Sequence, residues 1–419
     1  MSFKSLSRVA VTLALLLAAA TASSQTVLRW LHIETDPAIQ ALFEQTAREF
    51  EAKHPGTKVV VQLLENEAYK AKLPTLLQSQ ERPHIIHSWG GGVMQAQVRA
   101  GVLQDLDASL RGAWGDSFVP SALGAFRYQD KAWGVPSQMN QVGFYYNRAL
   151  FAKAGVSADA LKTWPQFLDA VKKLKAAGIT PIIAGGGDKW PLHFYWTHLA
   201  LRIGGKPAFE AAQRGEAGGF GGEVFVQAGE RMKELIELKP FQAGWQAVAG
   251  PASYGQFGDG RGAMTLMGNW VVPQQRIYAA NRKGLAEAEL GWFAFPALPG
   301  GRGDPRETLG GVNGWLLTAG SPPLAVELLK VVSGQALQGA LGAQGRIVPA
   351  VKGAETGMTD LFQKLAAQQI AASPYHQLFY DQLLGPDVGR VVNDVSVELA
   401  AGRTTPKAAA EAIEQARKR

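Results

Sequence analysis

Strand-like and helix-like segments alternate regularly over the first hundred residues, and this order restricts the fold more than any other feature. The helical pattern of residues 37–55 follows Asp36 as its N-cap, with Pro37 in the first position and Gly56 beyond its end. The alternating segments are strand 26–33, helix 37–55, strand 58–64, helix 67–80, strand 84–89 and helix 93–100. This order is typical of a parallel sheet covered by helices on both faces, so the sequence predicts an α/β protein.

The pattern changes in the middle of the chain. Two extended segments, 132–138 and 142–147, flank a polar turn, and helices then predominate. The predicted helices are 148–154, 165–177, 191–203, 223–238 and 323–333, with strand-like segments at 263–268 and 310–318 and a helical C-terminal section. We find no internal repeat and no long polar linker. We therefore expect a second α/β lobe that is joined to the first by short, ordered crossings.

The N-terminus has the layout of a secretory signal peptide. Lys4 and Arg8 precede an apolar run over residues 9–20, and small residues follow at 20–22. The run is short for a membrane-spanning helix, which needs about 20 residues, although an uncleaved anchor is the alternative. The chain contains no cysteine, which a bacterial lipoprotein requires at its cleavage site. We expect residues 1–24 to be removed and the mature protein to reside in the periplasm.

The charge and motif content argues against several classes of function. The formal net charge of +7 is scattered, with only the tail "EQARKR" clustered, so nucleic-acid binding has little support. Neither His84 with His87 nor His193 with His198 has a third ligand at metal spacing, and we expect no metal site. The sequence lacks a nucleophile elbow, a Walker loop and a dinucleotide fingerprint. We therefore expect a protein that is not an enzyme and needs no cofactor.

Six segments together resemble the extracellular solute-binding proteins of carbohydrate ABC importers, the family that includes maltose-binding protein. They are "VLRWLHIE" with "FEQTAREFEAKHPGTKVVVQ", "RPHIIHSWGGGVMQAQVRAGVLQDLD", "AWGVPSQMNQVGFYYNRALFAKAGV", "TWPQFLDAVKKLKAAG", "FGDGRGAMTLMGNWV" and "GGVNGWLLT". The resemblance covers nearly the whole mature chain. It departs at His84, where relatives commonly carry Asp, and this departure concerns the identity of the sugar.

This resemblance implies a two-lobed periplasmic-binding-protein fold of type II with a ligand cleft between the lobes, hinge closure and a helical C-terminal section. The N-terminal lobe would comprise residues 25–137 and 311–346, and the C-terminal lobe residues 138–310 and 347–419. It further implies a substrate-binding component that captures a mono- or oligosaccharide and delivers it to a membrane permease. Monomers are usual in the family.

Sugar binding requires flat aromatic platforms for the C–H faces of the ring. In the segment "MTLMGNWVVPQQ", a strand runs to Gly268, Asn269 makes a turn, and Trp270 opens a helix at the position where the family places a stacking Trp. Ligands of open α/β sheets bind beyond the carboxyl ends of strands, which is where Trp270 and Trp89 fall. Other tryptophans near element ends are Trp190, Trp196 and Trp315. For each of the five, packing in the core is the alternative.

Sugar hydroxyls require polar side chains at the ring edge. Glu34 and Asp36 follow the first strand, and Glu67 lies at the start of the second helix. Asn140 and Asn313 lie at lobe crossings. Four of them have a structural alternative: Asp36 as a helix cap, Glu67 as a first-turn acid, and the two asparagines as turn residues. We therefore favour Glu34 over Asp36.

Two other functions remain as alternatives. One is binding of a non-sugar solute such as a polyamine, a phosphate ester or a peptide. The other is a periplasmic glycan hydrolase or lyase that uses paired carboxylates such as Glu34 and Glu67.

Overall fold

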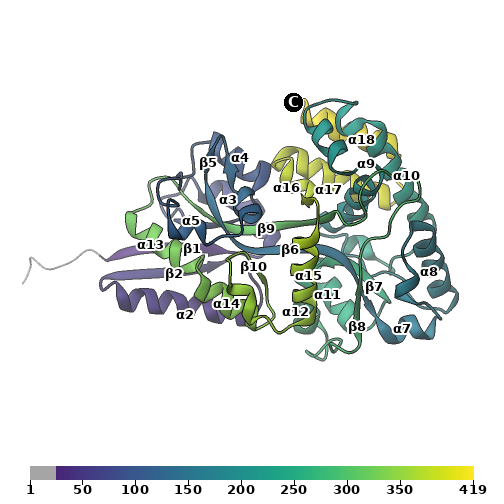
Figure 1. The fold of residues 1–419 in the computed structure, drawn as a ribbon, viewed down its shortest axis with the longest axis horizontal. Helices are drawn as coiled ribbons and strands as arrows, with labels where there is room; N and C mark the ends of the chain where they lie inside the picture. The colour runs from purple at the N-terminus through teal and green to yellow at the C-terminus, as the bar shows by residue number, and fades with distance from the viewer. Residues whose placement is uncertain (1–24) are drawn as a thin grey trace, which may run out of the picture.

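The computed structural model describes residues 25–419, so the predicted signal peptide lies outside the described residues. Two α/β lobes lie side by side, and the strands β6 (Gly134–Asn147) and β9 (Thr308–Leu317) run through both (Figure 1). Helices α16 (Tyr380–Leu383), α17 (Pro386–Ala400) and α18 (Pro406–Arg417) form a helical C-terminal section on the second lobe. The predicted two-lobed α/β fold is confirmed.

The first lobe is built on three parallel strands. Strand β1 (Thr26–His32) lies between β2 (Thr57–Leu63) and β3 (Ile85–Ser88), with Thr26 opposite Thr57 and Trp30 opposite Ile85. Its helices are α2 (Pro37–Lys53), α3 (Asn66–Leu76), α4 (Gly91–Arg99), α5 (Ala113–Asp116), α6 (Pro120–Gly124), α13 (Pro323–Val332) and α14 (Gln335–Ala343). Two short strands, β4 (Arg127–Tyr128) and β5 (Lys131–Ala132), form a separate hairpin.

Helix α2 shows how local sequence determines where a helix of this lobe begins and which face it packs on the sheet. The Asp36 carboxylate accepts a hydrogen bond from the Ala38 backbone N–H at 2.8 Å, which confirms the predicted N-cap. Apolar residues at helical spacing, among them Phe43 and Phe50, then pack with Trp30 in one core cluster. Tyr69 of α3 belongs to the cluster on the opposite face of the sheet. The sheet is thus covered on both faces.

Strand β6 corrects one expectation. The predicted polar turn between residues 138 and 142 is absent, because these residues continue a single strand that pairs antiparallel with β9, from Gly134 opposite Leu316 to Gln141 opposite Gly310. Backbone hydrogen bonds to β9 on one side hold the polar residues Gln138 and Asn140 in extended form, with an irregularity between Pro136 and Gln138. The two strands therefore form a paired crossing between the lobes.

The second lobe continues the same sheet. Strands β7 (Met264–Gly268) and β8 (Leu290–Phe293) pair with the later part of β6, and β11 (His376–Leu378) pairs with β9. Phe144 of β6 lies 4.8 Å from Phe167 and 5.0 Å from Phe293, measured between ring centroids. The helices here are α7 (Arg148–Lys153), α8 (Trp164–Ala176), α9 (His193–Gln213), α10 (Glu223–Glu237), α11 (Gly250–Gly258) and α12 (Val271–Tyr278).

The segment after residue 346 passes between the lobes. Ile347, Val351 and Ala354 pack in the core cluster of the first lobe, and β10 (Val348–Pro349) pairs with β6. Helix α15 (Leu361–Ala372) places Phe362 in the second-lobe core. The exact lobe boundaries stay a prediction, but this packing favours a last crossing later than residue 346.

Among residues 25–419, no helix is both long enough and apolar enough to cross a membrane. The same residues contain no group of three His, Cys, Asp or Glu side chains that could hold a metal ion.

The lobes also meet where α4 approaches the turn between α16 and α17. A Cβ atom added to Gly92 would lie 2.5 Å from the backbone nitrogen of Gly385 and would overlap the carbonyl oxygen of Leu383. Because both obstacles are backbone atoms, they cannot rotate away. Close contact of the lobes at this edge therefore depends on the absence of a side chain at position 92.

We predict that Gly92→Ala separates α4 from this turn and destabilises the protein by roughly 1 to 3 kcal/mol, because a methyl group in filled space forces the backbone to shift. Urea unfolding measures the free energy, and small-angle scattering measures the separation of the lobes. Gly124→Ala is the control, since its Cβ would meet nothing within 4 Å. Identical unfolding and scattering for the two variants would contradict the prediction.

Candidate functional site between the lobes

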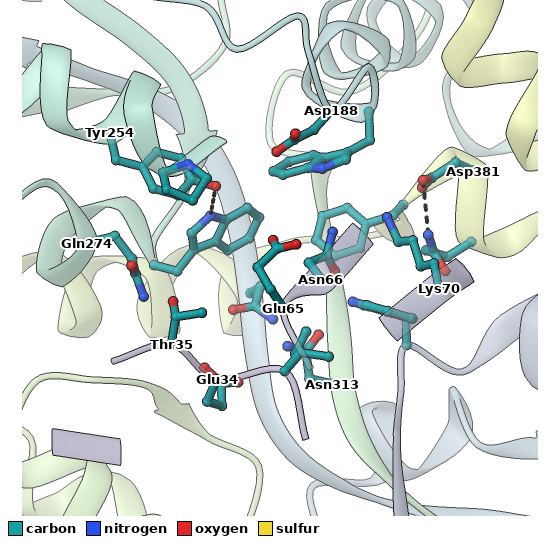
Figure 2. Close-up of a pocket in the computed structure, with 18 of the residues that line it drawn as sticks. Glu34, Thr35, Glu65, Asn66, Lys70, Asp188, Tyr254, Gln274, Asn313 and Asp381 are labelled. Atoms are coloured by element: carbon teal, nitrogen blue, oxygen red, sulfur yellow. Dashed lines mark hydrogen bonds between the residues drawn. The ribbon is translucent and has the colours of Figure 1, made fainter. Parts of the chain in front are cut away.

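A pocket lies between the lobes, where the crossing strands form its floor (Figure 2). It contains about 940 Å³ of space between atoms, counted to its open mouth. Gln138 and Asn140 of β6 and Asn313 of β9 line it between the two walls. A ligand here would touch both lobes at once.

The first-lobe wall follows from sheet geometry. Residues 33–35 follow β1, Glu65 and Asn66 follow β2, and Trp89 follows β3. The carboxyl ends of parallel strands meet at one edge of a sheet, so these segments converge although they are far apart in the sequence. Lys70 completes this wall from the first turns of α3.

The second-lobe wall presents Trp270 through a fixed turn. The Asn269 side chain accepts a hydrogen bond from the Gln141 backbone N–H at 3.0 Å and donates to Gln363 Oε1 at 2.6 Å, so the turn is tied to β6 and to α15. Trp270 is the N-cap residue of α12, and its indole N–H donates to the Tyr254 hydroxyl at 3.1 Å (Figure 2). The turn predicted from the sequence thus delivers Trp270 to the cavity.

Several aromatic side chains surround the same space. The ring centroid of Trp270 lies 6.1 Å from that of Trp190 and 6.0 Å from that of Phe379. Trp89, on the opposite lobe, lines the pocket as well. The half-buried indoles of Trp89, Trp190 and Trp270 are therefore available to a ligand, because their remaining surface faces the cavity.

Six of the ten residues predicted for the site are brought together here. They are Glu34, Trp89, Asn140, Trp190, Trp270 and Asn313. That each of them contacts a ligand stays a prediction.

The other four do not line this pocket. Asp36 caps α2 and pairs with Arg346 at 3.0 Å, and Glu67 pairs with Lys70 at 3.0 Å. Trp196 is 0% exposed, and its indole N–H donates to the Phe225 carbonyl oxygen at 2.9 Å within the second-lobe core.

Trp315 is 2% exposed and packs edge-on against Trp30, with the ring centroids 5.3 Å apart. For Asp36, Glu67, Trp196 and Trp315, the structural alternative named above accounts for the side chain without a ligand.

Sequence reasoning missed several residues that line the pocket. They are Ile33, Thr35, Glu65, Asn66, Lys70, Gln138, Asp188, His193, Phe194, Pro251, Tyr254, Gln274, Phe379, Asp381 and Gln382. Asp188 stands in the segment "GGGD" just before Trp190, and its position in a Gly-rich loop was a usable signal. Tyr254 and Asp381 lie inside helices, and only tertiary packing brings those helices to the cleft.

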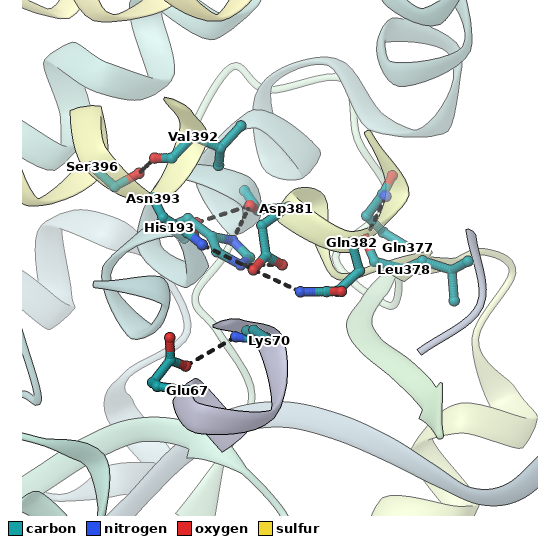
Figure 3. A network of polar contacts seen from close by, with 11 residues as sticks. Glu67, Lys70, His193, Gln377, Leu378, Asp381, Gln382, Val392, Asn393 and Ser396 are labelled. Atoms are coloured by element: carbon teal, nitrogen blue, oxygen red, sulfur yellow. Dashed lines mark hydrogen bonds and ion pairs between the residues drawn. The ribbon is translucent and has the colours of Figure 1, made fainter. Parts of the chain in front are cut away.

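A buried contact between His193 and Asp381 supports one end of the pocket (Figure 3). His193 Nε2 lies 3.2 Å from Asp381 Oδ1, and the side-chain amides of Gln382 and Asn393 donate to Asp381 Oδ2 at 3.0 Å each. Burial by itself would raise the pKa of Asp381, but attraction to His193 outweighs it and holds the pKa below its usual range. The network connects α9, α16 and α17, so it fixes this wall of the cleft.

Glu34 has an unusual titration for an acid beside a ligand cavity. Burial, together with the nearby charge of Asp36, raises the pKa of Glu34 to about 7, although Gln138 lowers it slightly through a 3.4 Å hydrogen bond. Near neutral pH this carboxyl group therefore exists in both forms. As a protonated acid it can donate to a ligand, and as a carboxylate it can only accept.

We predict that Glu34→Gln removes a pH-dependent loss of stability. Between pH 4.5 and pH 7 the folded protein keeps a proton on Glu34 that the unfolded chain releases, so the free energy of unfolding falls as the pH rises through this window. From pH 5 to pH 8 the variant should gain roughly 2 to 3 kcal/mol relative to the wild type. Urea unfolding of both proteins at the two pH values measures this gain. A difference that does not change with pH would contradict the prediction.

The comparisons with known proteins agree with this geometry. The family profile of bacterial extracellular solute-binding proteins matches residues 30–338. A multiple sugar-binding protein of Streptococcus mutans is 21% identical over 270 residues, which cover 63% of this chain and 61% of that protein. The chain spans 52% to 61% of the length of the first curated relatives that it matches.

Two solved structures have the same fold over nearly the whole chain. One comes from a structural study of xylan utilization by Caldanaerobius polysaccharolyticus, with a TM-score of 0.86, 25% identity, and coverage of 93% of this chain and 99% of that chain. The other is a chitin oligosaccharide binding protein, with a TM-score of 0.84, 26% identity, and coverage of 94% and 99%. The profile match extends over more than half of the sequence. This chain belongs to the family of bacterial extracellular solute-binding proteins.

Proposed function

We propose that this protein binds a carbohydrate in the pocket between its lobes and delivers it to the permease of an ABC importer. One observation carries the proposal: Trp89, Trp190 and Trp270, from both lobes, converge with polar side chains on one cavity. The apolar faces of a sugar ring pack on indoles, and its hydroxyls need partners in the plane of the ring.

Several polar groups that line the cavity lack hydrogen-bond partners. Within the described residues, the amide oxygens Asn313 Oδ1 and Gln274 Oε1 and the indole nitrogen Trp190 Nε1 are buried without a hydrogen-bond partner. Buried polar atoms without partners are costly, roughly 1 to 3 kcal/mol each. Ligand hydroxyls at these positions would supply the missing hydrogen bonds and favour binding.

The arrangement of the walls supports capture by closure. Trp89 and Glu65 lie on the first lobe, and Trp190, Tyr254 and Trp270 lie on the second. A ligand that contacts both walls has more contacts when the lobes are closed, so it shifts the population toward the closed form. The closed form is then the state that docks on the permease.

The names of the relatives support a sugar as the ligand. Membership of the family supports delivery to an ABC-importer permease, a periplasmic location and a monomeric state. We place the mature protein in the periplasm after removal of residues 1–24, as a monomer. The glycan hydrolase alternative has less support. Of its two carboxylates, Glu34 lines the cavity, whereas Glu67 lies at its edge and pairs with Lys70 at 3.0 Å. The protein is therefore proposed as a binder without turnover.

We predict saturable binding of one class of oligosaccharide without product formation. Residues 25–419 would be screened by thermal shift against mono-, di- and trisaccharides, polyols, polyamines, amino acids and phosphate esters, with calorimetry on each hit. Chromatography of the ligand after incubation tests for turnover. A cleaved product, or a response restricted to solutes without a sugar ring, would overturn the proposal.

We further predict that Trp270→Ala weakens binding of that ligand by roughly 1.5 to 4 kcal/mol, from the lost stacking and apolar contact. Gly268→Ala should weaken it in the same direction without removing the indole, because a Cβ at position 268 would overlap the Trp270 ring. Calorimetry measures both affinities.

Trp133→Ala is the matched control, since this half-buried indole packs on the first-lobe core outside the cavity. Wild-type affinity in Trp270→Ala, or an equal loss in Trp133→Ala, would remove Trp270 from the proposed site.

A further inference from the structure

Carboxyl groups outnumber cationic groups among the side chains that line the pocket. Glu34, Glu65, Asp188 and Asp381 line it. The two cationic or titratable nitrogen groups that line it already have partners: Lys70 pairs with Glu67 at 3.0 Å, and His193 pairs with Asp381 at 3.2 Å. Among the residues that the structure describes, neither Glu65 nor Asp188 forms an ion pair.

Glu65 and Asp188 belong to opposite lobes and reach the same cavity (Figure 2). One oxygen of each accepts a backbone N–H, that of Glu67 at 3.0 Å for Glu65 and that of Gly250 at 2.7 Å for Asp188. Among residues 25–419, no donor is found for the second oxygen of either carboxylate. Burial and the charges of Glu67 and Glu65 raise the pKa of Asp188. The two lobes therefore bring like charges toward each other, which opposes closure unless a ligand supplies positive charge or donors.

Aromatic side chains lie beside these carboxylates. Trp190 is two residues from Asp188, and Trp270 donates to the hydroxyl of Tyr254. Burial raises the pKa of Tyr254, and the nearby charges of Asp188 and Glu65 add to this increase. Ammonium groups bind well where an aromatic face and a carboxylate coincide.

The protein contains its own example of this arrangement on the adjacent wall. Lys70 Nζ lies 5.5 Å from the ring centroid of Trp89, while a carboxylate oxygen of Glu67 holds it at 3.0 Å. An indole and a carboxylate thus already hold one ammonium group at the edge of this cleft.

Two further side chains point to a ligand that is rich in donors. Gln274 is 9% exposed and Asn313 is 8% exposed, both line the cavity, and the amide oxygen of each lacks a partner within the described residues (Figure 2). Each of these oxygens accepts and cannot donate. An ammonium group offers three donors, so it matches these two oxygens better than an anion does, while a sugar hydroxyl can accept from the unpartnered indole N–H of Trp190.

We infer that the ligand carries a positively charged amino group, which lies between the carboxylates of Glu65 and Asp188 beside Trp190 and Trp270. Given the proposed function on which this inference rests, the substrate class is an amino sugar with a free amine. Its ammonium group relieves the repulsion between the lobes and so couples recognition to closure. Uronates and sugar phosphates would add negative charge to the same place, so we expect them to bind more weakly than the amino sugar.

The test compares ligands that differ in one substituent. Calorimetry at pH 6 would use dimers and trimers of β-1,4-linked glucosamine, N-acetylglucosamine and glucose, the monosaccharide pair galactosamine and galactose, and spermidine as a cation without a sugar ring. We expect the amino form to bind at least about tenfold more tightly than its hydroxyl and N-acetyl counterparts, as charge-assisted hydrogen bonds predict. The preference should shrink as the salt concentration rises.

Variants assign the preference to the two carboxylates. In Glu65→Gln and in Asp188→Asn, the ratio of amino to hydroxyl affinity should fall toward one. Asp169→Asn removes one negative charge from an exposed site on α8, where Asp169 pairs with Lys172, and it should keep the wild-type ratio. Thermal unfolding of each variant checks that the fold is retained.

The possible outcomes distinguish the amino-group inference from the proposed carbohydrate function. Equal or tighter binding of hydroxyl or N-acetyl sugars would overturn the amino-group inference and leave the carbohydrate function standing. Binding of spermidine with no sugar bound would overturn the carbohydrate function and keep the ammonium site. An amino preference that survives both carboxylate variants would remove Glu65 and Asp188 from it.

Discussion

The antiparallel pairing of β6 with β9 is the constraint on which the rest of the structure depends. Each strand starts in one lobe and ends in the other, and they are paired from Gly134 with Leu316 to Gln141 with Gly310. Pairing fixes the register of both strands, so polar residues at the crossing cannot turn away from the cleft. Asn140 and Asn313 therefore form the floor of the pocket. The walls are attached to this floor, because β3 pairs with β9 and β7 pairs with β6.

The chemistry of the cleft follows from where the strands end. The first lobe contributes the residues after three parallel strands, and the second contributes the turn after β7, which Asn269 ties to β6 through the Gln141 backbone. Aromatic faces and acceptors therefore meet from two lobes that the paired strands β6 and β9 connect. Because each lobe has its own core, the contacts between lobes can change while the cores stay intact. Carboxylates from both lobes face the same cavity and repel each other. A ligand that favours closure would have to offset this repulsion.

The sequence predicted much of the fold and a smaller part of the site. Local signals were sufficient for Asp36 as a cap and for the turn before Trp270, because both depend on neighbouring residues. They failed at the β6 crossing, where pairing with β9 overrides the turn preference of Asn140. The local sequence did not distinguish Trp196 and Trp315 from Trp190, because all three are tryptophans near the ends of predicted elements. Only three-dimensional packing separates a core indole from one that lines the cleft. Tyr254, Gln274 and Asp381 carry no local motif, so no sequence signal was available for them.

A crystal structure of the protein with the tightest-binding oligosaccharide would show whether the ligand lies in the pocket between the lobes. We expect a sugar ring against the indole of Trp270, between the two lobes, with hydroxyl or amino groups within hydrogen-bond distance of Asn313 and Gln274. We also expect the lobes to lie closer together than in crystals without ligand. Ligand bound elsewhere on the surface, with this pocket filled only by water, would contradict this expectation.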